Sequence, residues 1–368
     1  LPMDKLKWYE IKDAENVVSP ALLIYPERID KNIQTMIGIA EGTEFLRPHI
    51  KTHKMAEIIK MQMHHGIHMF KCATLTEAEL LAQCGAEDIL LALQPVGPNI
   101  KRFCDLMEKY PNSKFSTLVD NEASIQAFAQ IAASKNKKVA LWLDINNGMD
   151  RTGIVPGNRA IELYQAIDKN PNLIAKGLHV YDGHIHEPDF DKRKKMCDAD
   201  FAPILKLKAD LEKLGIKVEG LVAGGTPSFP IHAKRKNVVT SPGTTTLWDS
   251  GYGNSYKDLD FLNAAVLLTR ITSKPQPDLL CFDLGHKSVA SEMSLPRVEI
   301  MGLEGSEQIS QSEEHLVVRC SEADKYNVGD TFYAIPLHIC PTVSKYPEAL
   351  TVVDGVVTGA WKVAARDH

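Results

Sequence analysis

The sequence has no long apolar run, no closely paired cysteines and no excess of positive charge. No stretch approaches the ~18 apolar residues of a membrane helix, and the first residues carry charges instead of a signal-length apolar run. The seven cysteines form no C-x-x-C pair, which argues against a disulfide framework and suggests a reducing compartment. The net charge of −5 gives no sign of a nucleic-acid surface. We therefore expect a soluble cytoplasmic protein with no nucleic-acid or membrane partner.

The 368 residues have ordinary globular composition and are enough for one large and one smaller domain. From about residue 27, helical patterns alternate with strand-like runs. These runs are Phe45–Ile50, His68–Ala73, Ile89–Leu93, Phe115–Val119, Val139–Ile145, Gly177–Tyr181, Val218–Val222 and Val238–Thr240. Strands with helical crossovers predict an α/β fold, a (β/α)8 TIM barrel. From the pattern alone, an open doubly wound sheet remains the alternative.

After about residue 256 the pattern changes to short runs rich in Val, Leu, Thr and Ile, separated by turns. The runs are Ala265–Ile271, Leu279–Phe282, Arg297–Leu303, His315–Arg319, Thr331–Ile335, Leu350–Asp354 and Val356–Trp361. This spacing predicts a C-terminal antiparallel β domain. One further run, Ala21–Tyr25, precedes the first helical pattern and has no place among the eight barrel strands.

The segment Phe45–Lys54 has the sequence FLRPHIKTHK, in which an apolar stub leads into a basic turn and then a helical pattern. Parallel α/β folds present reactive groups at the carboxyl ends of their strands. Nearby positive charge favours the neutral amine of a lysine, and a neutral amine can form a Schiff base. A solvated basic turn is the alternative interpretation of these residues.

This segment resembles the cofactor-lysine segment of the D-threonine aldolase and D-serine dehydratase family. Five further motifs follow in the family's order along nearly the whole chain: Asp144–Gly153, Gly177–His184, Gly224–Ser228, Ser241–Thr244 and His338–Thr342. Members of this family have the alanine-racemase type of fold and use pyridoxal 5'-phosphate (PLP). The resemblance therefore implies a PLP-binding (β/α)8 barrel at residues 26–255. Residues 1–25 would join residues 256–368 in the β domain.

The resemblance makes Lys51 the Schiff-base candidate, because the family's lysine follows His-x, and Lys54 is the competing choice. His49 and His53 flank Lys51 and could act on the cofactor or hydrogen-bond within the turn. Arg151 matches an arginine that faces the cofactor's phenolic oxygen in the family. A guanidinium stays protonated and would hold that oxygen anionic.

Tyr181 ends the sixth predicted strand, and its motif suggests a place at the edge of the cofactor ring, although buried tyrosines usually belong to a core. Two glycine-containing segments follow the seventh and eighth predicted strands, where barrels often hold phosphate. Glycine lets backbone N–H groups approach an anion closely, and threonine adds a hydroxyl donor. The predicted phosphate anchors are Gly224, Gly225, Thr226, Gly243 and Thr244.

His338 and Cys340 are one residue apart in a strand-like segment, so both side chains are expected on one face. Imidazole and thiolate suit zinc, and two protein ligands would leave positions open for water and substrate. The resembled family binds a divalent metal here through His-x-Cys or His-x-Asp. The cysteine favours zinc over manganese or magnesium and the dehydratase branch over the aldolase branch.

The predicted reaction is a lyase reaction on a D-configured β-hydroxy amino acid. His184 and His186 lie just past Tyr181, and either could be the base for a substrate hydroxyl, whereas the family's aldolases use a position where this chain has Glu187. We favour D-threonine aldolase-like cleavage to glycine and an aldehyde because this loop offers such bases. Dehydration of D-serine to pyruvate and ammonia is the alternative.

Three further alternatives stay open. An amino-acid racemase needs a second base on the opposite face of the cofactor, and we identify none. A non-catalytic PLP carrier would lack the β domain and the metal pair. A metal hydrolase barrel based on His49 and His53 lacks an accompanying carboxylate set. The residues do not specify the oligomer, and we expect a homodimer.

Overall fold

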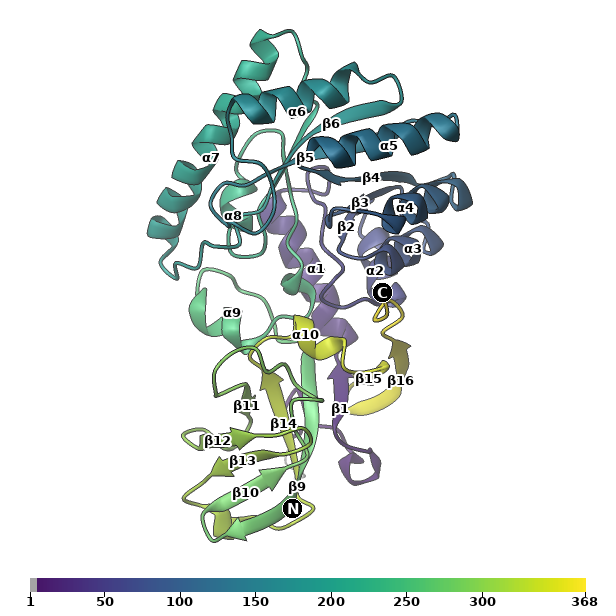
Figure 1. Ribbon diagram of the computed structural model, residues 1–368. Helices are drawn as coiled ribbons and strands as arrows, with labels where there is room; N and C mark the ends of the chain where they lie inside the picture. The colour runs from purple at the N-terminus through teal and green to yellow at the C-terminus, as the bar shows by residue number, and fades with distance from the viewer. Residues whose placement is uncertain (1–4) are drawn as a thin grey trace. The chain divides into compact units, whose positions relative to one another are not determined.

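The computed structural model describes residues 5–368, and the chain forms two compact units (Figure 1). The β unit contains the chain up to Thr35, the segment Thr52–Ile58 and Thr244–Arg366. The barrel unit contains Met36–Lys51, Ile59–Gly243 and Asp367–His368. Helices α1 (Pro26–Ala40) and α2 (Ala56–His64) each begin in the β unit and end in the barrel unit. The domain boundaries inferred from sequence, at residues 25 and 255, stay a prediction.

The barrel unit is built on a seven-stranded sheet whose strands all pair in parallel with their neighbours in the chain. Its strands are β2 (Met69–Cys72), β3 (Asp88–Leu91), β4 (Lys114–Val119), β5 (Val139–Ile145), β6 (Leu173–Val180), β7 (Gly220–Ala223) and β8 (Val238–Thr240). Because the strands follow chain order without the reversal of a doubly wound sheet, the predicted barrel architecture is confirmed.

The predicted first strand, Phe45–Ile50, does not form a continuous strand. It pairs in parallel at only two places, Leu46 with Thr240 of β8 and His49 with Lys71 of β2, and so bridges the two ends of the sheet. Pro48 interrupts this segment because proline has no N–H to donate to a ladder.

Helices connect the strands of the barrel unit, and Figure 1 shows α3 to α6 outside strands β2 to β6. They are α3 (Leu75–Gln83), α4 (Pro98–Lys109), α5 (Glu122–Ser134), α6 (Asn158–Lys169), α7 (Phe190–Lys213) and α8 (Phe229–His232). Side chains of Thr74, Asn121 and Asp189 cap α3, α5 and α7 by accepting a backbone N–H. Along the described residues, no helix is both long enough and apolar enough to cross a membrane.

The inner face of the parallel sheet is apolar over part of its length. Leu90, Leu118, Trp142 and Val222, from four different strands, form one buried cluster. The Trp142 indole donates a 3.0 Å hydrogen bond to the Ser116 hydroxyl, which satisfies its buried N–H. This apolar cluster therefore fills part of the barrel interior, and the polar groups lie nearer the carboxyl ends of the strands.

The β unit is built on a nine-stranded sheet with the order β12-β13-β10-β9-β1-β15-β16, in which β14 pairs with β9 and β11. The strands are β1 (Ala21–Ile24), β9 (Ala265–Gln276), β10 (Leu279–Phe282), β11 (Val298–Ile300), β12 (Glu307–Gln311), β13 (Leu316–Arg319), β14 (Thr331–Pro336), β15 (Glu348–Val353) and β16 (Val356–Lys362). Short helices accompany them: η1 (Ala14–Asn16), η2 (Thr244–Thr246), α9 (Ser250–Ser255), η3 (Ala323–Lys325) and α10 (Cys340–Val343).

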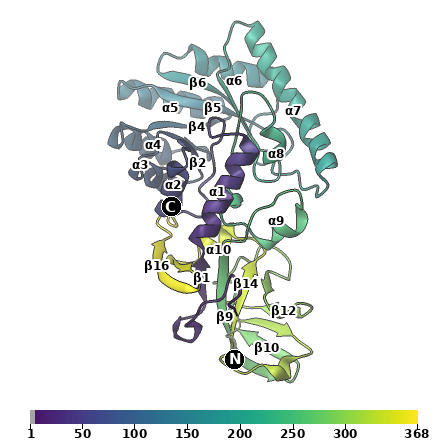
Figure 2. The ribbon, with the colours of Figure 1, turned by 180° about the vertical axis from the view of Figure 1, so that it is seen from behind.

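Strand β1 lies among strands from the far end of the chain, as the purple and yellow ribbons of Figure 2 show. It pairs antiparallel with β9 and parallel with β15, so the prediction of a purely antiparallel sheet is wrong at this pair. Strand β12 was not predicted because its sequence, EQISQ, is mostly polar. It pairs with β13 alone, and none of its five residues is buried, so it needs no apolar face.

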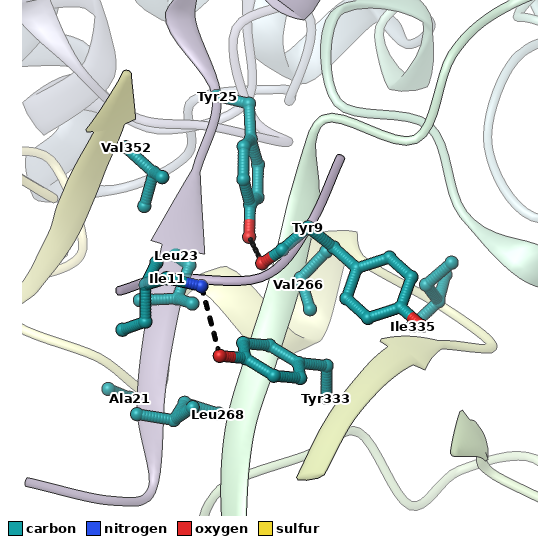
Figure 3. Packing of buried hydrophobic residues seen from close by; sticks show 10 residues of the cluster. All are labelled: Tyr9, Ile11, Ala21, Leu23, Tyr25, Val266, Leu268, Tyr333, Ile335 and Val352. Carbon is teal, nitrogen blue, oxygen red and sulfur yellow. Dashed lines mark hydrogen bonds between the residues drawn. The ribbon is translucent and has the colours of Figure 1, made fainter. Parts of the chain in front are cut away.

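The core around β1 is apolar, with tyrosine hydroxyls bonded to the backbone (Figure 3). The Tyr25 hydroxyl donates to the carbonyl oxygen of Tyr9 at 2.6 Å. The Tyr333 hydroxyl accepts the N–H of Ile11 at 3.1 Å. Both rings are thereby buried without leaving a polar atom unsatisfied, which ties the segment before β1 to the sheet.

Candidate active site

Three of the predicted cofactor residues come together in the barrel unit. The Lys51 Nζ atom lies 5.9 Å from the centroid of the Tyr181 ring, and the Arg151 guanidinium carbon lies 5.0 Å from it. Lys51 follows the bridging segment, Arg151 lies in the loop after β5, and Tyr181 directly follows β6. Parallel strands bring their carboxyl ends to one edge, which is how residues far apart in sequence meet here. Two cationic side chains therefore share one aromatic ring.

Glycines surround the Tyr181 ring because no other residue fits. A Cβ atom added to Gly225 would lie 2.8 Å from the ring, and one added to Gly183 would lie 2.3 Å from it. Gly224 has a φ of +76°, and a Cβ there would lie 2.5 Å from the Ser228 hydroxyl oxygen. The two loops thus press their backbones against the ring, which forms a cradle without competing side chains.

The backbone N–H groups predicted to bind phosphate already have partners within the chain. The N–H of Gly224 donates to the last carbonyl of β6 at 2.9 Å. The N–H of Gly225 donates to the Ser228 hydroxyl at 3.3 Å, and that of Gly243 to the Thr226 hydroxyl at 3.2 Å. The two bonds to hydroxyls are long for N–H donors, so an anion could replace the hydroxyls at little cost. Phosphate binding by this loop stays a prediction.

Asp182, directly after Tyr181, anchors the glycine loop. Its carboxylate accepts the Ser228 hydroxyl at 2.6 Å and the His232 Nε2 at 2.7 Å. Burial alone would raise the pKa of Asp182, but the hydrogen bonds from His232 and Ser228 hold it below its usual value. Cys197 completes a group with metal-ligand spacing, yet Arg235 donates to His232 Nδ1 at 3.2 Å, which leaves the Nε2 proton for Asp182. The polar atoms of Asp182 and His232 therefore have hydrogen-bond partners within the chain, and the cluster supports the glycine loop.

A second buried carboxylate, Asp144, fixes the loop that carries Arg151. It accepts hydrogen bonds from Gln94 at 2.7 Å, from the Thr152 hydroxyl at 2.8 Å and from His179 Nδ1 at 2.8 Å. Burial, followed by the charge of Lys71, lowers the pKa of His179 to about 4, so its ring is neutral near pH 7. Among the described residues, its buried Nε2 has no hydrogen-bond partner. An acceptor is thus left for a bound group.

The two histidines predicted as bases differ in their surroundings. His184 is half-buried and its Nε2 lies 2.7 Å from the Asp200 carboxylate. Its ring fits against Gly148, where a Cβ would lie 2.7 Å from Nε2. His186 is exposed. His184 therefore lies against the loop that carries Arg151. Its hydrogen bond is to Asp200 and not to Lys51.

The histidines on either side of Lys51 accept hydrogen bonds from the backbone. His49 Nδ1 accepts the N–H of Lys51 at 3.3 Å, and His53 Nδ1 accepts the N–H of Met55 at 3.0 Å. Burial, followed by the charge of Lys54, lowers the pKa of His53 to about 3. Both histidines thus stabilise the turn in their neutral form.

The prediction that His338 and Cys340 share one face of a strand is wrong, although their side chains do meet. Strand β14 ends at Pro336 and α10 begins at Cys340, with Pro341 in its first turn. Proline suits the first turn of a helix and cannot continue a strand ladder, which explains the change. The turn nevertheless brings the imidazole of His338 into a hydrogen bond with Cys340.

Carboxylates surround this pair within the β unit. Glu292 is hydrogen-bonded to His338 Nδ1, and the buried Asp249 accepts the N–H of Ile339 at 3.0 Å. Burial alone would lower the pKa of His338, but Cys340, Glu292 and Asp249 outweigh it and raise the value to about 9. The pair therefore favours a positive charge at this position.

Two threonine hydroxyls of the β unit lie beside the Cys340 thiol. The Cys340 Sγ lies 3.1 Å from the Thr52 hydroxyl and 3.6 Å from the Thr244 hydroxyl. Thr52 directly follows Lys51 and Thr244 directly follows Gly243.

Sequence reasoning missed several of these residues or mentioned them only within a motif. Asp182 and His179 were part of matched motifs without a role, and Lys71, Gln94 and His232 were not singled out. Their signal was weak. Lys71 and His179 are polar residues in strands that otherwise read as apolar, Gln94 and Asp182 lie in the loops after β3 and β6, and His232 is the last residue of α8.

Comparison with known proteins places these features in a family. A sequence model of the alanine racemase N-terminal domain matches residues 24–247, and one of a putative serine dehydratase domain matches residues 264–352. D-threonine aldolase of an Arthrobacter species is 28% identical over 357 residues, 95% of this chain and 93% of that protein. 3-Hydroxy-D-aspartate aldolase of Paracoccus denitrificans is 27% identical over 367 residues, 96% of this chain and 93% of that protein.

The fold is shared with solved structures as well. The crystal structure of D-threonine aldolase from Filomicrobium marinum superposes with a TM-score of 0.87 at 24% identity, covering 97% of this chain and 98% of that one. The resemblance stated from sequence motifs is therefore confirmed. Because the first sequence model spans more than half of its residues, this chain belongs to the family of the alanine racemase N-terminal domain.

Proposed function

We propose that this protein is a PLP- and divalent-metal-dependent lyase that cleaves a D-configured β-hydroxy amino acid into glycine and an aldehyde. The observation that carries the proposal is the meeting of Lys51 and Arg151 at the Tyr181 ring within a cradle of glycines. Relatives named D-threonine aldolase and 3-hydroxy-D-aspartate aldolase support it. We expect the protein to act as a homodimer.

The residues at the Tyr181 ring suit the reactive end of PLP. When bound, PLP supplies an electron sink for the electrons of the bond that breaks at the substrate Cα. Lys51 offers the primary amine that links to the cofactor aldehyde. Arg151 cannot lose its proton and would hold an anionic ring oxygen. The buried Nε2 of His179 is an acceptor that still needs a donor.

The phosphate would lie at the two glycine segments after β7 and β8. Gly224, Gly225 and Gly243 keep side chains away, and the hydroxyls of Thr226 and Thr244 would donate to it. The Ser228 hydroxyl now accepts the N–H of Gly225 and donates to Asp182. An incoming anion would take over that N–H, while Asp182 would keep the loop in place.

His338 and Cys340 are the proposed metal ligands. When bound, the metal supplies a Lewis acid for the substrate hydroxyl. An imidazole with a thiolate suits zinc better than manganese or magnesium, which prefer oxygen ligands. The raised pKa of His338 supports the assignment, since a cation could replace the proton that this cluster of acceptors attracts. Glu292 would orient the ring through Nδ1.

Cleavage needs a base for the hydroxyl proton, and we assign it to His184. Asp200 fixes the ring through Nε2, as the carboxylate of a catalytic triad orients its histidine. In the described part of the chain, the buried Nδ1 of His184 has no partner, which leaves a lone pair to accept the proton. His186 is the alternative base, and its exposed side chain is less fixed.

Dehydration is the second candidate, and Cys340 is the observation that favours it. A thiolate ligand gives the softer metal site that the dehydratase branch of the resembled family uses. D-threo-3-hydroxyaspartate dehydratase of a Delftia strain is 27% identical over 214 residues, and D-serine dehydratase of Dictyostelium discoideum is 22% identical over 373. Racemisation is less favoured because we find no assigned base for the opposite face of the cofactor.

Product analysis separates these reactions. The purified enzyme, loaded with PLP and with zinc or manganese, is given D-threonine, L-threonine or D-serine. We expect glycine and acetaldehyde from D-threonine. The L-isomer should react more slowly by ~100-fold or more, because its hydroxyl would lie away from the metal. Pyruvate and ammonia from D-serine without aldehyde formation would instead assign the dehydratase reaction, and equal turnover of both threonines would refute D-specificity.

A further inference from the structure

Lys71 is a lysine within the barrel wall to which the proposed function assigns no role. It lies in β2, and its side chain is almost completely buried. Its N–H donates to the carbonyl of Pro48 at 3.0 Å, and its carbonyl accepts the N–H of Ile50 at 2.9 Å. It also pairs with His49 in a parallel bridge. The backbone therefore fixes Lys71 beside the segment that ends at Lys51.

The strand register points the Lys71 side chain into the barrel. Lys71 pairs with Leu90 of β3, a member of the apolar cluster on the inner face, and paired residues of parallel strands project to the same face. Asp144 lies two residues after Trp142 of that cluster and pairs with His179. All three polar side chains thus project inward.

Four charged groups act on Lys71 from the surrounding elements. Burial is the largest cause that lowers its pKa, to about 7, and the positive charges of Lys51 and Arg47 add to it. The carboxylates of Asp144 and Asp182 oppose the shift. The neutral His179 is the other titratable group facing it, and Arg47 is paired with Asp88 at 2.7 Å. Lys71 and Lys51 are thus near enough for their charges to interact.

We propose that Lys71 is a positioning residue that acts through its charge: its ammonium group keeps a second positive charge off the Lys51 nitrogen and so sets the pH at which the covalent link between Lys51 and PLP takes up a proton. The inference rests on the proposed binding of PLP at Lys51. Like charges repel strongly in a protein interior, and a neighbouring cation is one known way to activate a lysine amine.

The test follows the visible absorption band of the PLP-loaded enzyme across pH, for wild type, Lys71→Met and Lys71→Arg. The methionine removes the charge at similar length, so the midpoint of the spectral change should rise by about one pH unit or more. The arginine keeps a charge that does not titrate, so its midpoint should equal the wild-type value or lie below it. A methionine variant with full PLP content and an unmoved midpoint would overturn the proposal.

Two controls separate charge from packing and from the proposed function. Lys60→Met removes an exposed lysine of α2 and should leave the midpoint unchanged. If Lys71→Met does not yield folded protein, the Lys71→Arg variant decides the question. A Lys71→Arg midpoint above the wild-type midpoint contradicts the charge effect. A midpoint at or below the wild-type midpoint supports it. A wild-type enzyme that takes up no PLP overturns the proposed function together with this inference. Bound PLP with an unmoved midpoint in Lys71→Met overturns this inference alone.

Discussion

The two units bury polar side chains for different purposes. In the barrel unit, Asp144 and Asp182 are buried carboxylates, each held by several side-chain hydrogen bonds at the ends of strands. In the β unit, the core around β1 is apolar, and tyrosines such as Tyr25 and Tyr333 bond only to backbone groups (Figure 3). The barrel interior therefore orients reactive loops, whereas the β-unit core holds the N-terminal and C-terminal parts of the chain in one sheet.

The direction of the pKa shifts differs in the same way. Burial in the barrel unit lowers the pKa of His179 to about 4 and that of Lys71 to about 7, so both groups hold a proton less strongly than they would in water. Next to Cys340 and Glu292 in the β unit, the pKa of His338 rises instead to about 9. One region thus disfavours additional positive charge and the other attracts it, as expected for an amine site and a cation site.

The largest expected effect comes from Lys51→Ala in the barrel unit. Removing the only amine proposed to link PLP should lower turnover by ~10⁴-fold or more, while the urea midpoint stays near wild type. Borohydride reduction followed by peptide mass analysis should find PLP on Lys51 in the wild type. Lys54→Ala is the matched control in the same turn and should retain the label. A label on Lys54 would contradict the assignment.

The metal site of the β unit is tested by His338→Ala. Loss of one of two protein ligands should release the metal and lower turnover by ~10³-fold, since a Lewis acid contributes several kcal/mol. Metal content by elemental analysis and the visible PLP band are measured together. The band should persist because Lys51 is untouched. His315→Ala, at an exposed histidine of the same unit, should change neither, and unchanged metal content in His338→Ala would refute the site.

The structural role of the β-unit core is tested by Leu23→Ala. Leu23 is fully buried in β1, where it pairs with Val266 and Leu350, so the cavity should cost about 3 kcal/mol of unfolding free energy. PLP content and turnover of the folded fraction should stay near wild type. Val18→Ala, at a largely exposed position, is the control and should cost under about 0.5 kcal/mol. Equal losses in both variants would show that this core does not stabilise the unit.

A smaller effect is expected from the pH dependence of stability at His53. The pKa of His53 in the folded protein, about 3, lies below its usual value. As the pH falls, the unfolded chain therefore takes up a proton at His53 before the folded protein does. The free energy of unfolding that is present above pH 6.5 is lost as the pH falls below it. Between pH 6.5 and about 4.5, this histidine should account for roughly 2–3 kcal/mol. Urea unfolding of His53→Gln should therefore depend less steeply on pH than that of the wild type. Curves with equal slopes would refute it.

Secondary structure was predictable wherever local pattern and neighbours agree. The predicted bounds of β5 and β8 match the structure residue for residue, because both read as short apolar runs between turn residues. The bridging segment at Pro48 and the turn at His338–Cys340 were misjudged, since proline overrides the apolar pattern there. Strand β12 was missed because pairing with β13 stabilises a polar segment that no periodicity marks.

By itself, the sequence indicated parallel strands with helical crossovers, and its motifs containing Lys51, Arg151, Tyr181 and the His338–Cys340 pair indicated the family and, through it, the barrel. Each of these depends on residues close together in the chain, or on spacing that repeats along it. Only the tertiary structure decided that Asp182 supports the glycine loop and that Lys71 faces the interior beside Lys51. Burial and charge interactions depend on the register between strands, and that register is set by packing of the whole barrel rather than by any local stretch.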